Sequence, residues 1–190
     1  MLIVGLDLSL TSSGVVRLGA GVPTDPGGNP LHSLHRVQSK AVAGRDTAAK
    51  SRRLRTIAGE VTALCAGADL ALVEGPSYGS EGRGTWDRAG LWWLVVARLT
   101  GAGLNVVEIP PSNLKQYVLG KGGGKDTGKD QMLAAVIRRY PWAAVDGNDV
   151  ADALGLAAMG ARFAQHPVDE LPAKNLTALR GIAWAPNERG

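Results

Sequence analysis

The sequence is poor in the features that tie a protein to a membrane or to an oxidising compartment. Its single cysteine, Cys65, excludes an intrachain disulfide, so a reducing cytosol is the simplest compartment. The longest apolar run beyond the first strand, residues 91–97, is far too short to span a bilayer. No basic segment precedes the apolar start, and Asp7 interrupts it early, which indicates a strand rather than a signal peptide. We therefore expect a cytoplasmic protein with no membrane partner.

Aromatic residues are also scarce, at 5%, and no internal repeat is found. What is present fits one ordinary globular domain, because 190 residues that are 45% hydrophobic can bury a core without staples. The 26 glycines indicate many turns and close approaches of the backbone. The net charge of +4 and the isoelectric point of about 9.5 point only weakly to an anionic partner, since many basic proteins never bind nucleic acid.

Hydrophobic periodicity predicts an α/β domain with a mixed sheet flanked by helices. Strands are expected over residues 2–8, 15–18, 70–74 and 105–109, and 33–39 is a candidate fifth strand, third in chain order. Ser12, Ser13 and Gly14 are expected to form a hairpin turn. Helices are expected over residues 46–65, 85–99, 112–118, 127–139 and 148–165, with Ser112, Thr127 and Asn148 as N-caps of the last three. Residues 1–165 form the expected domain and 166–190 a tail of little periodicity.

Four carboxylates stand out. Asp7 and Glu74 each end an apolar strand, where an unneutralised charge is costly, and Asp149 and Asp152 lie three residues apart on one helical face. Taken singly, either helical acid is explained by the helix dipole, and Asp7 by a polar strand end. Together they would repel one another unless a cation joined them. All-oxygen ligands favour Mg²⁺ or Mn²⁺, and two such ions could activate water on a phosphodiester.

Basic residues gather between residues 113 and 139, where six lysines and arginines accompany two acids. A solvated face explains this equally simply, but beside a carboxylate site the lysines would hold phosphates. The candidates are Lys115, Lys121, Lys125 and Lys129. The stretch 123–129 almost matches a phosphate-binding loop of nucleotide triphosphatases, but Asp130 stands where Ser or Thr must bind Mg²⁺, so we expect no nucleotide cofactor.

These motifs carry a family resemblance. The opening Ile3-Val4-Gly5-Leu6-Asp7-Leu8-Ser9, the segment Leu72-Val73-Glu74 and the helix start Asp149-Val150-Ala151-Asp152-Ala153-Leu154 resemble RuvC-type Holliday junction resolvases, in order and in spacing over about residues 1–165. The chain is similar to small stand-alone members found in bacteriophages. The resemblance implies an RNase H-like fold with a five-stranded sheet, a homodimer, and a four-carboxylate site for two Mg²⁺, for which Mn²⁺ could substitute.

The resemblance further implies that Asp7, Glu74, Asp149 and Asp152 are catalytic metal ligands. Lys115 and Lys129 lie where the family has DNA-contacting lysines, and Lys129 is expected nearest the cut phosphate. The expected activity is resolution of four-way junctions or other branched DNA in a bacterial or phage-infected cytosol.

One departure concerns the position three residues after Glu74, where members often carry Phe. Here it is Ser77, and the neighbouring Tyr78 is the candidate for stacking on an unpaired base. Trp92 and Trp93 are core residues by default, and one of them is a candidate for the dimer face.

Three other functions stay open on the sequence. An RNase H-like nuclease that cuts flaps or single strands would use the same acids. A fragment of a sugar or acetate kinase is disfavoured by the short length and the missing phosphate loops. A non-catalytic DNA-binding module would gain nothing from four carboxylates that face phosphates.

Overall fold

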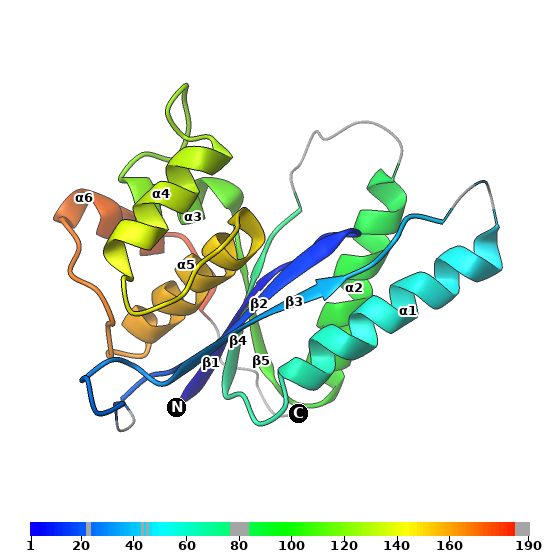
Figure 1. Ribbon diagram of the computed structural model, residues 1–190, viewed down its shortest axis with the longest axis horizontal. Coiled ribbons are helices and arrows are strands. Elements are labelled where there is room, and N and C mark those ends of the chain that lie inside the picture. The colour runs from blue at the N-terminus through cyan, green and yellow to red at the C-terminus, as the bar shows by residue number, and fades with distance from the viewer. Residues whose placement is uncertain (22–23, 43, 45, 77–83, 185–190) are drawn as a thin grey trace.

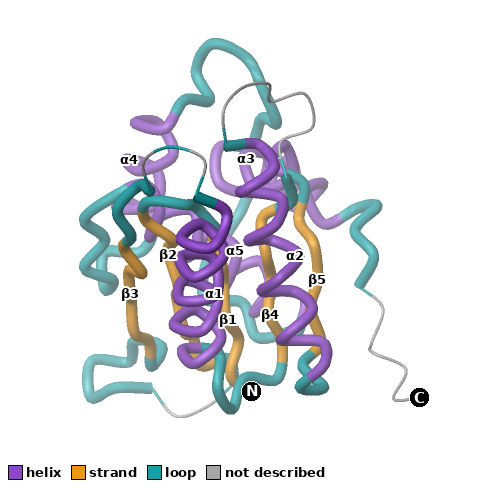
Figure 2. Tube along the Cα trace, turned by 90° about the vertical axis from the view of Figure 1, so that its right-hand side faces the viewer, coloured by secondary structure: helices purple, strands orange, loops and turns teal. Residues whose placement is uncertain are grey.

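The computed structural model describes residues 1–21, 24–42, 44, 46–76 and 84–184. Its centre is one five-stranded sheet in the order β3-β2-β1-β4-β5 (Figure 2). The strands are β1 (Leu2–Asp7), β2 (Ser12–Gly19), β3 (His32–Gln38), β4 (Leu70–Glu74) and β5 (Asn105–Ile109). β1, β2 and β3 pair antiparallel, whereas β1, β4 and β5 pair parallel. The expected mixed sheet of five strands, including the candidate strand at 33–39, is confirmed.

Helices cover both faces of this sheet (Figure 1). One face carries α1 (Thr47–Leu64) and α2 (Thr85–Gly101), and the other carries α3 (Pro111–Leu119), α4 (Lys129–Arg139) and α5 (Asn148–Phe163). The short α6 (Ala173–Leu176) and the 3₁₀ turn η1 (Thr177–Leu179) follow. None of the described helices combines the length and the apolar character needed to cross a membrane.

The alternation of side chains along each strand divides the core into two halves. Ile3, Leu70 and Leu72 pack under α3, α4 and α5, whereas the intervening Val4 and Val73 pack under α1 and α2. Because both faces are covered, β1 and β4 are apolar throughout rather than alternating with polar residues. Only the carboxylates at their ends break the apolar run.

Helix α5 lies close to the sheet because glycines face it. A Cβ at Gly5 in β1 would collide with the carbonyl oxygen of Ala153, and one at Gly14 in β2 with that of Asp149. No other residue leaves room for a helix backbone at these points. The first two turns of α5 are thus fixed against the ends of β1 and β2.

The expected hairpin turn at residues 12–14 was wrong, because these residues belong to β2 and Gly14 is the register partner of Asp7. The turn lies at residues 8–11 instead. It is closed by the buried Ser13, whose hydroxyl accepts from the Ser9 N–H at 2.9 Å and donates to the Ser9 carbonyl at 2.8 Å. These polar bonds supply the turn that Gly14 was expected to make.

The three expected N-caps were also wrong. Helix α3 begins at Pro111 and α5 at Asn148, so Ser112 and Asn148 lie inside their helices. Thr127 turns back instead, and its hydroxyl donates to the Gly124 carbonyl at 2.8 Å. Gly124 and Thr127 lie in the loop that joins α3 to α4. No strand precedes this loop, unlike the phosphate-binding loop that residues 123–129 almost match.

Residues 166–184 pack against the domain, although the sequence shows little periodicity there. Asn113 donates to the carbonyl of Ala178 at 2.7 Å, and Asn175 donates to the carbonyl of Tyr117 at 2.7 Å. Both bonds tie this segment to α3. The expected boundary at residue 165 stays a prediction, but the segment beyond it helps to hold α3 in place.

The same segment buries one carboxylate completely. The side chain of Asp169 is 0% exposed and accepts from the hydroxyls of Tyr117 and Tyr140, at 3.0 and 2.5 Å. The guanidinium of Arg162 pairs with it at 2.6 Å. Burial is the main reason that the pKa of Tyr117 is raised, followed by the charge of Asp169, so both tyrosines remain neutral donors. Asp169 therefore has a full set of hydrogen-bond donors.

Candidate active site

Two acids meet at one end of the sheet. Leu6 and Val73 are register partners in the parallel pair β1–β4, so Asp7 and Glu74, the next residues, end neighbouring strands side by side. Alternation puts both on the face that carries α5, since Asp7 follows Ile3 and Gly5 on that face and Glu74 follows Leu72. The indole N–H of Trp92 donates to the main-chain carbonyl of Glu74 at 2.9 Å and fixes the end of β4.

Helix α5 brings the third acid. Asp152 lies one residue before Ala153, which contacts Gly5, so it lies beside the ends of β1 and β4. Asp7, Glu74 and Asp152 share one cleft of about 770 Å³ between α2 on one side and α3 and α4 on the other. The remaining lining residues are Leu8, Gly75, Pro76, Thr85, Arg88, Ala89, Trp92, Pro111, Leu114, Lys115, Thr127, Gly128, Lys129 and Met132.

The electrostatics of the cleft favour a cation. Burial of the carboxyl group, followed by the charge of Glu74, raises the pKa of Asp7 to about 8. Burial, followed by the charge of Asp152, raises the pKa of Glu74 to about 7. Burial raises the pKa of Asp152 to about 6, against the opposing charges of Lys129 and Lys115. Three carboxylates that resist ionisation together would be stabilised in their charged form by a divalent ion.

Asp149 differs from the other three acids. It raises the pKa of Asp7 by its charge, so it lies near the cleft, but it does not line it. Burial opposes its ionisation, yet hydrogen bonds from Ser12 and Arg36 outweigh burial and lower its pKa. The Arg36 Nε lies 3.0 Å from one Asp149 oxygen and 3.1 Å from the other. Asp149 is thus already neutralised by a partner on β3.

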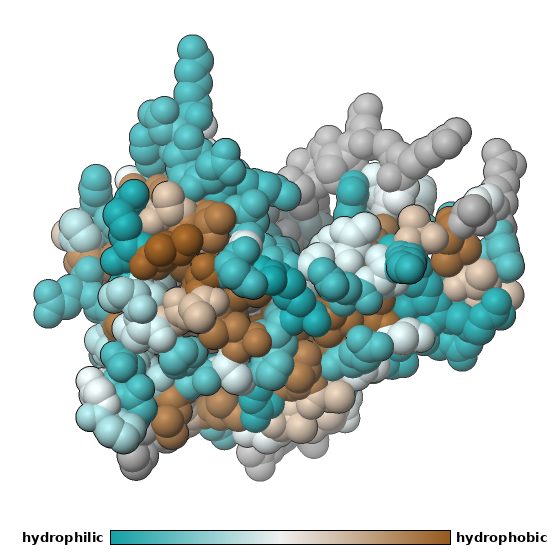
Figure 3. All heavy atoms as spheres, in the orientation of Figure 1, coloured by the Kyte–Doolittle hydropathy of each residue, from teal (hydrophilic) through white to brown (hydrophobic). Residues whose placement is uncertain are grey.

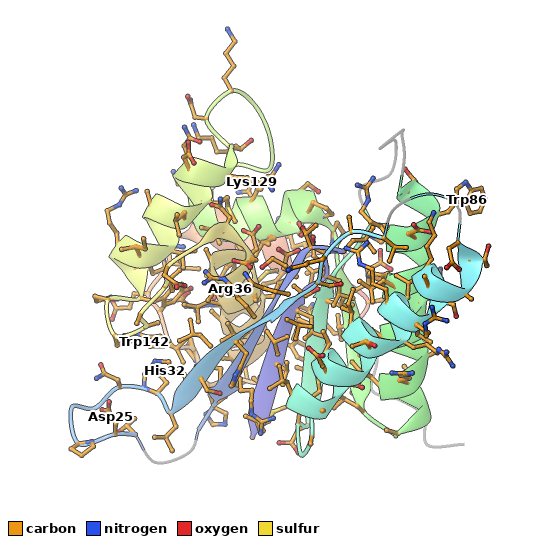
Figure 4. All side chains as sticks on the ribbon, turned by 45° about the vertical axis from the view of Figure 1, so that its right-hand side comes forward. Asp25, His32, Arg36, Trp86, Lys129 and Trp142 are labelled. Carbon is orange, nitrogen blue, oxygen red and sulfur yellow. The ribbon has the colours of Figure 1, made fainter. Side chains whose placement is uncertain are left out.

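Sequence reasoning missed this partner. It did not single out Arg36 of β3 (Figure 4), whose guanidinium donates to the carboxylate of Asp149. Nothing in the local pattern indicates a pair that spans 113 positions. The sequence signal is an arginine inside an edge strand, where a charged side chain needs no burial.

The predicted lysines divide into two groups. Lys115 and Lys129 line the cleft opposite the acids, and both lower the pKa values of Glu74 and Asp152. Lys121 and Lys125 lie on the loop between α3 and α4, which projects as a hydrophilic finger (Figure 3). Lys121 pairs there with Asp126 at 3.1 Å. Lys125 is exposed.

One basic residue of the cleft was not predicted from the sequence. Arg88 of α2 lines the cleft on the wall opposite Lys115 and Lys129, a position that sequence reasoning did not single out. The flanking residues Asp87 and Ala89 do not mark Arg88 as a site residue in the sequence, because the cleft forms only when α2 faces α3. Tyr78, the candidate for base stacking, lies outside the described residues.

The donor set fits a hard divalent cation, because Asp7, Glu74 and Asp152 offer oxygen donors and no described histidine or cysteine lines the cleft. Within the described part of the chain, however, no group of three or more His, Cys, Asp or Glu side chains is already arranged to hold a metal ion. The three cleft acids would therefore have to turn toward a bound ion.

Comparison with solved structures identifies the fold. RuvC of Thermus thermophilus superposes with a TM-score of 0.66 at 18% identity, over 87% of this chain and 96% of that one. The same enzyme in complex with a Holliday junction substrate gives 0.64 at 16%, over 90% and 99%. The fowlpox virus resolvase in complex with Holliday junction DNA gives 0.56 at 12%, over 86% and 99%. No family model and no curated protein matches the sequence. The chain therefore has the RNase H-like fold of the RuvC-type resolvases.

Proposed function

We propose that this chain is a metal-dependent endodeoxyribonuclease that resolves four-way DNA junctions. The single observation that carries the proposal is the cleft in which Asp7, Glu74 and Asp152 meet opposite Lys115 and Lys129. Shared fold with resolvases in complex with junction DNA supports the choice of substrate. A structural ion-pair network would not leave three carboxylates with raised pKa values in one cleft.

Asp7, Glu74 and Asp152 would hold Mg²⁺ or Mn²⁺, and Asp149 would supply a further ligand for a second ion. When bound, two such ions supply an activated water and stabilise the leaving oxygen of a phosphodiester. Lys129, at the first turn of α4, would offset the charge that builds on the phosphate in the transition state. Lys115 and Arg88 would hold the strand from opposite walls of the cleft.

The proposed enzyme works as a homodimer, because two symmetric cuts need two sets of acids. Trp93, at 65% exposure, and Trp86, at 90%, lie seven residues apart on the outer face of α2. The exposed Gly90 and Ala97 lie between and beyond them on the same face. Large and small side chains that alternate along one helix can interdigitate with a two-fold copy of themselves. Trp92 is buried and is not part of this surface.

Cleavage of synthetic four-way junctions, flaps and linear duplexes, with Mg²⁺ and with EDTA, tests the activity. The proposal expects paired cuts in the junction, none in EDTA, and binding without efficient cutting in Ca²⁺, which is larger and less strict in its geometry. Equal cutting of junction and linear duplex would remove the resolvase assignment and favour a flap or single-strand nuclease. Full activity in EDTA would remove the metal site.

Light scattering tests the dimer separately. Trp93→Glu should convert the dimer to a monomer, since a charge at the centre of an apolar interface is costly. Ile137→Glu changes an exposed apolar residue on a different helix, α4, and should leave the assembly unchanged. A wild-type protein that is monomeric at working concentration would contradict this part of the proposal.

A further inference from the structure

Arg36 makes a contact set that the cutting reaction does not require. Its guanidinium holds two carboxylates at once, Asp146 through Nη1 and Nη2 at 2.9 and 2.6 Å and Asp149 through Nε. Asp149 also accepts from the Ser12 hydroxyl and, at 3.0 Å, from the N–H of Val150. Both carboxylate oxygens of Asp149 are therefore occupied by hydrogen-bond donors.

The surrounding backbone makes room for this arrangement. A Cβ at Gly147 would collide with Arg36 Nη2 and would lie 3.1 Å from an Asp149 oxygen. The side chain of Arg36 is 27% exposed and that of Asp149 15%, so the pair is only partly screened by water. Arg36 thus meets Asp149 at short range with a full positive charge.

The cleft acids are in the opposite condition. Among the described residues, no hydrogen bond or ion pair engages the side chains of Asp7, Glu74 and Asp152. A divalent ion that enters the cleft meets three carboxylates that face Lys115 and Lys129 but are not in a direct ion pair, whereas at Asp149 it meets an ion pair. A cation should therefore bind more readily at Asp7, Glu74 and Asp152 than at Asp149.

We propose that Arg36 occupies the position of a cation beside Asp149, and that a divalent ion gains Asp149 as a ligand only when this guanidinium gives way. This inference rests on the proposed metal site. In the DNA-free protein one ion binds at Asp7, Glu74 and Asp152, and binding of a second ion is weakened by Arg36. Arg36 is therefore a positioning residue that sets when the second ion binds.

The sign of one measurement decides between this role and a supporting one. If Arg36 merely held Asp149 in the right place, its removal would weaken metal binding. If it competes with the ion, its removal strengthens binding of the second ion. The measurement is a titration of metal-stripped, DNA-free protein with Mn²⁺, in which the electron paramagnetic resonance signal reports free Mn²⁺.

Wild-type protein should bind one Mn²⁺ tightly and a second weakly. Arg36→Gln should raise the affinity of the second site about tenfold, because a charge in direct contact with a ligand is removed. Arg36→Lys, which keeps the charge but loses the fork that spans two carboxylates, should raise it less and serves if Arg36→Gln does not fold. Arg138→Gln removes an exposed charge on α4 and should change neither site.

Adding Asp149→Asn to Arg36→Gln should abolish the gain, because the ligand itself is then lost. Unchanged or lowered affinity of the second site in both Arg36 variants would overturn the inference while leaving the metal site intact. A wild-type protein that binds no Mn²⁺ would overturn the proposed metal site, and this inference with it.

Discussion

The molecule contains two buried acidic regions that are built in opposite ways. Asp169 is fully enclosed, and two tyrosine hydroxyls and one guanidinium satisfy it. Asp7 and Glu74 lie in a cleft where burial and the charge of a neighbouring carboxylate, Glu74 for Asp7 and Asp152 for Glu74, oppose their ionisation. The cost of removing a carboxylate from water is met in the first region by fixed donors. In the second it is left unmet, and this makes the cleft receptive to a cation from outside.

Asp149 lies between these extremes. It belongs to the acidic set by position but is neutralised by Arg36 as Asp169 is by Arg162. Nearness in the fold therefore does not make the four acids equivalent. What separates Asp169 from the cleft acids is the number of donors that the fold has already supplied.

Asp7→Asn should have the largest effect. Removal of a ligand that no other residue replaces should lower the cutting rate by about 1,000-fold or more. Binding of junction DNA should survive or tighten, because one negative charge that faces the phosphates is lost. Single-turnover cleavage and a binding titration check this, and wild-type rates in the variant would remove Asp7 from the metal site.

Asp169→Ala should chiefly change stability. It leaves the half-buried Arg162 without its carboxylate partner and the Tyr140 hydroxyl without its acceptor, so the free energy of unfolding should fall by about 3–5 kcal/mol. Urea unfolding measures the change. Tyr140→Phe removes one donor only and should cost about 1 kcal/mol. A loss in Asp169→Ala no larger than in Tyr140→Phe would mean that the first region is not a stabilising cluster.

Lys129→Ala should separate turnover from binding in the second region. It faces Glu74 and Asp152, so its loss should lower the cutting rate about 100-fold with little change in affinity. Lys125→Ala, on the projecting loop, should mainly weaken binding and reduce its dependence on salt. Equal effects of the two variants on the cutting rate would show that Lys129 acts only as a surface charge.

The smallest expected effect is a pH dependence of stability in EDTA. The pKa of Asp7 is raised from 3.8 to about 8, so the folded state binds the proton more tightly than the unfolded state. Its contribution to stability is therefore full below about pH 4 and is lost as the pH rises toward 8. Asp7→Asn lacks this loss, so its stability should rise relative to that of wild type between pH 5 and pH 8. Thermal unfolding of both proteins checks it, and parallel pH profiles would contradict the raised pKa.

Much of the fold could be predicted because periodicity is local information. The runs at 2–8 and 70–74 are apolar on both faces, which is the pattern of central strands. The placement of Asp7, Glu74 and Asp152 followed from their position at strand ends and on a helix face. The wrong predictions lie at turns and helix caps. There the hydroxyls of Ser13 and Thr127 donate to main-chain carbonyls, and residue propensities for turns and caps do not predict these bonds.

The contacts that distinguish the acids from one another could not be predicted. Arg36 and Asp149 lie 113 residues apart, and Tyr117 and Asp169 lie 52 apart. Such pairs depend on how the elements pack rather than on their individual patterns. The sequence thus indicated which acids gather, but the donors available to each acid required the three-dimensional arrangement.

The late position of residues 166–184 has a consequence for synthesis. This segment leaves the ribosome after α3, the helix that carries Lys115 and that its bonds hold. The acids of the sheet and α5 can therefore assemble on the nascent chain before one wall of the cleft is fastened. On the proposed function, a chain that lacks this docked segment would hold the acids before the wall that carries Lys115 is fastened.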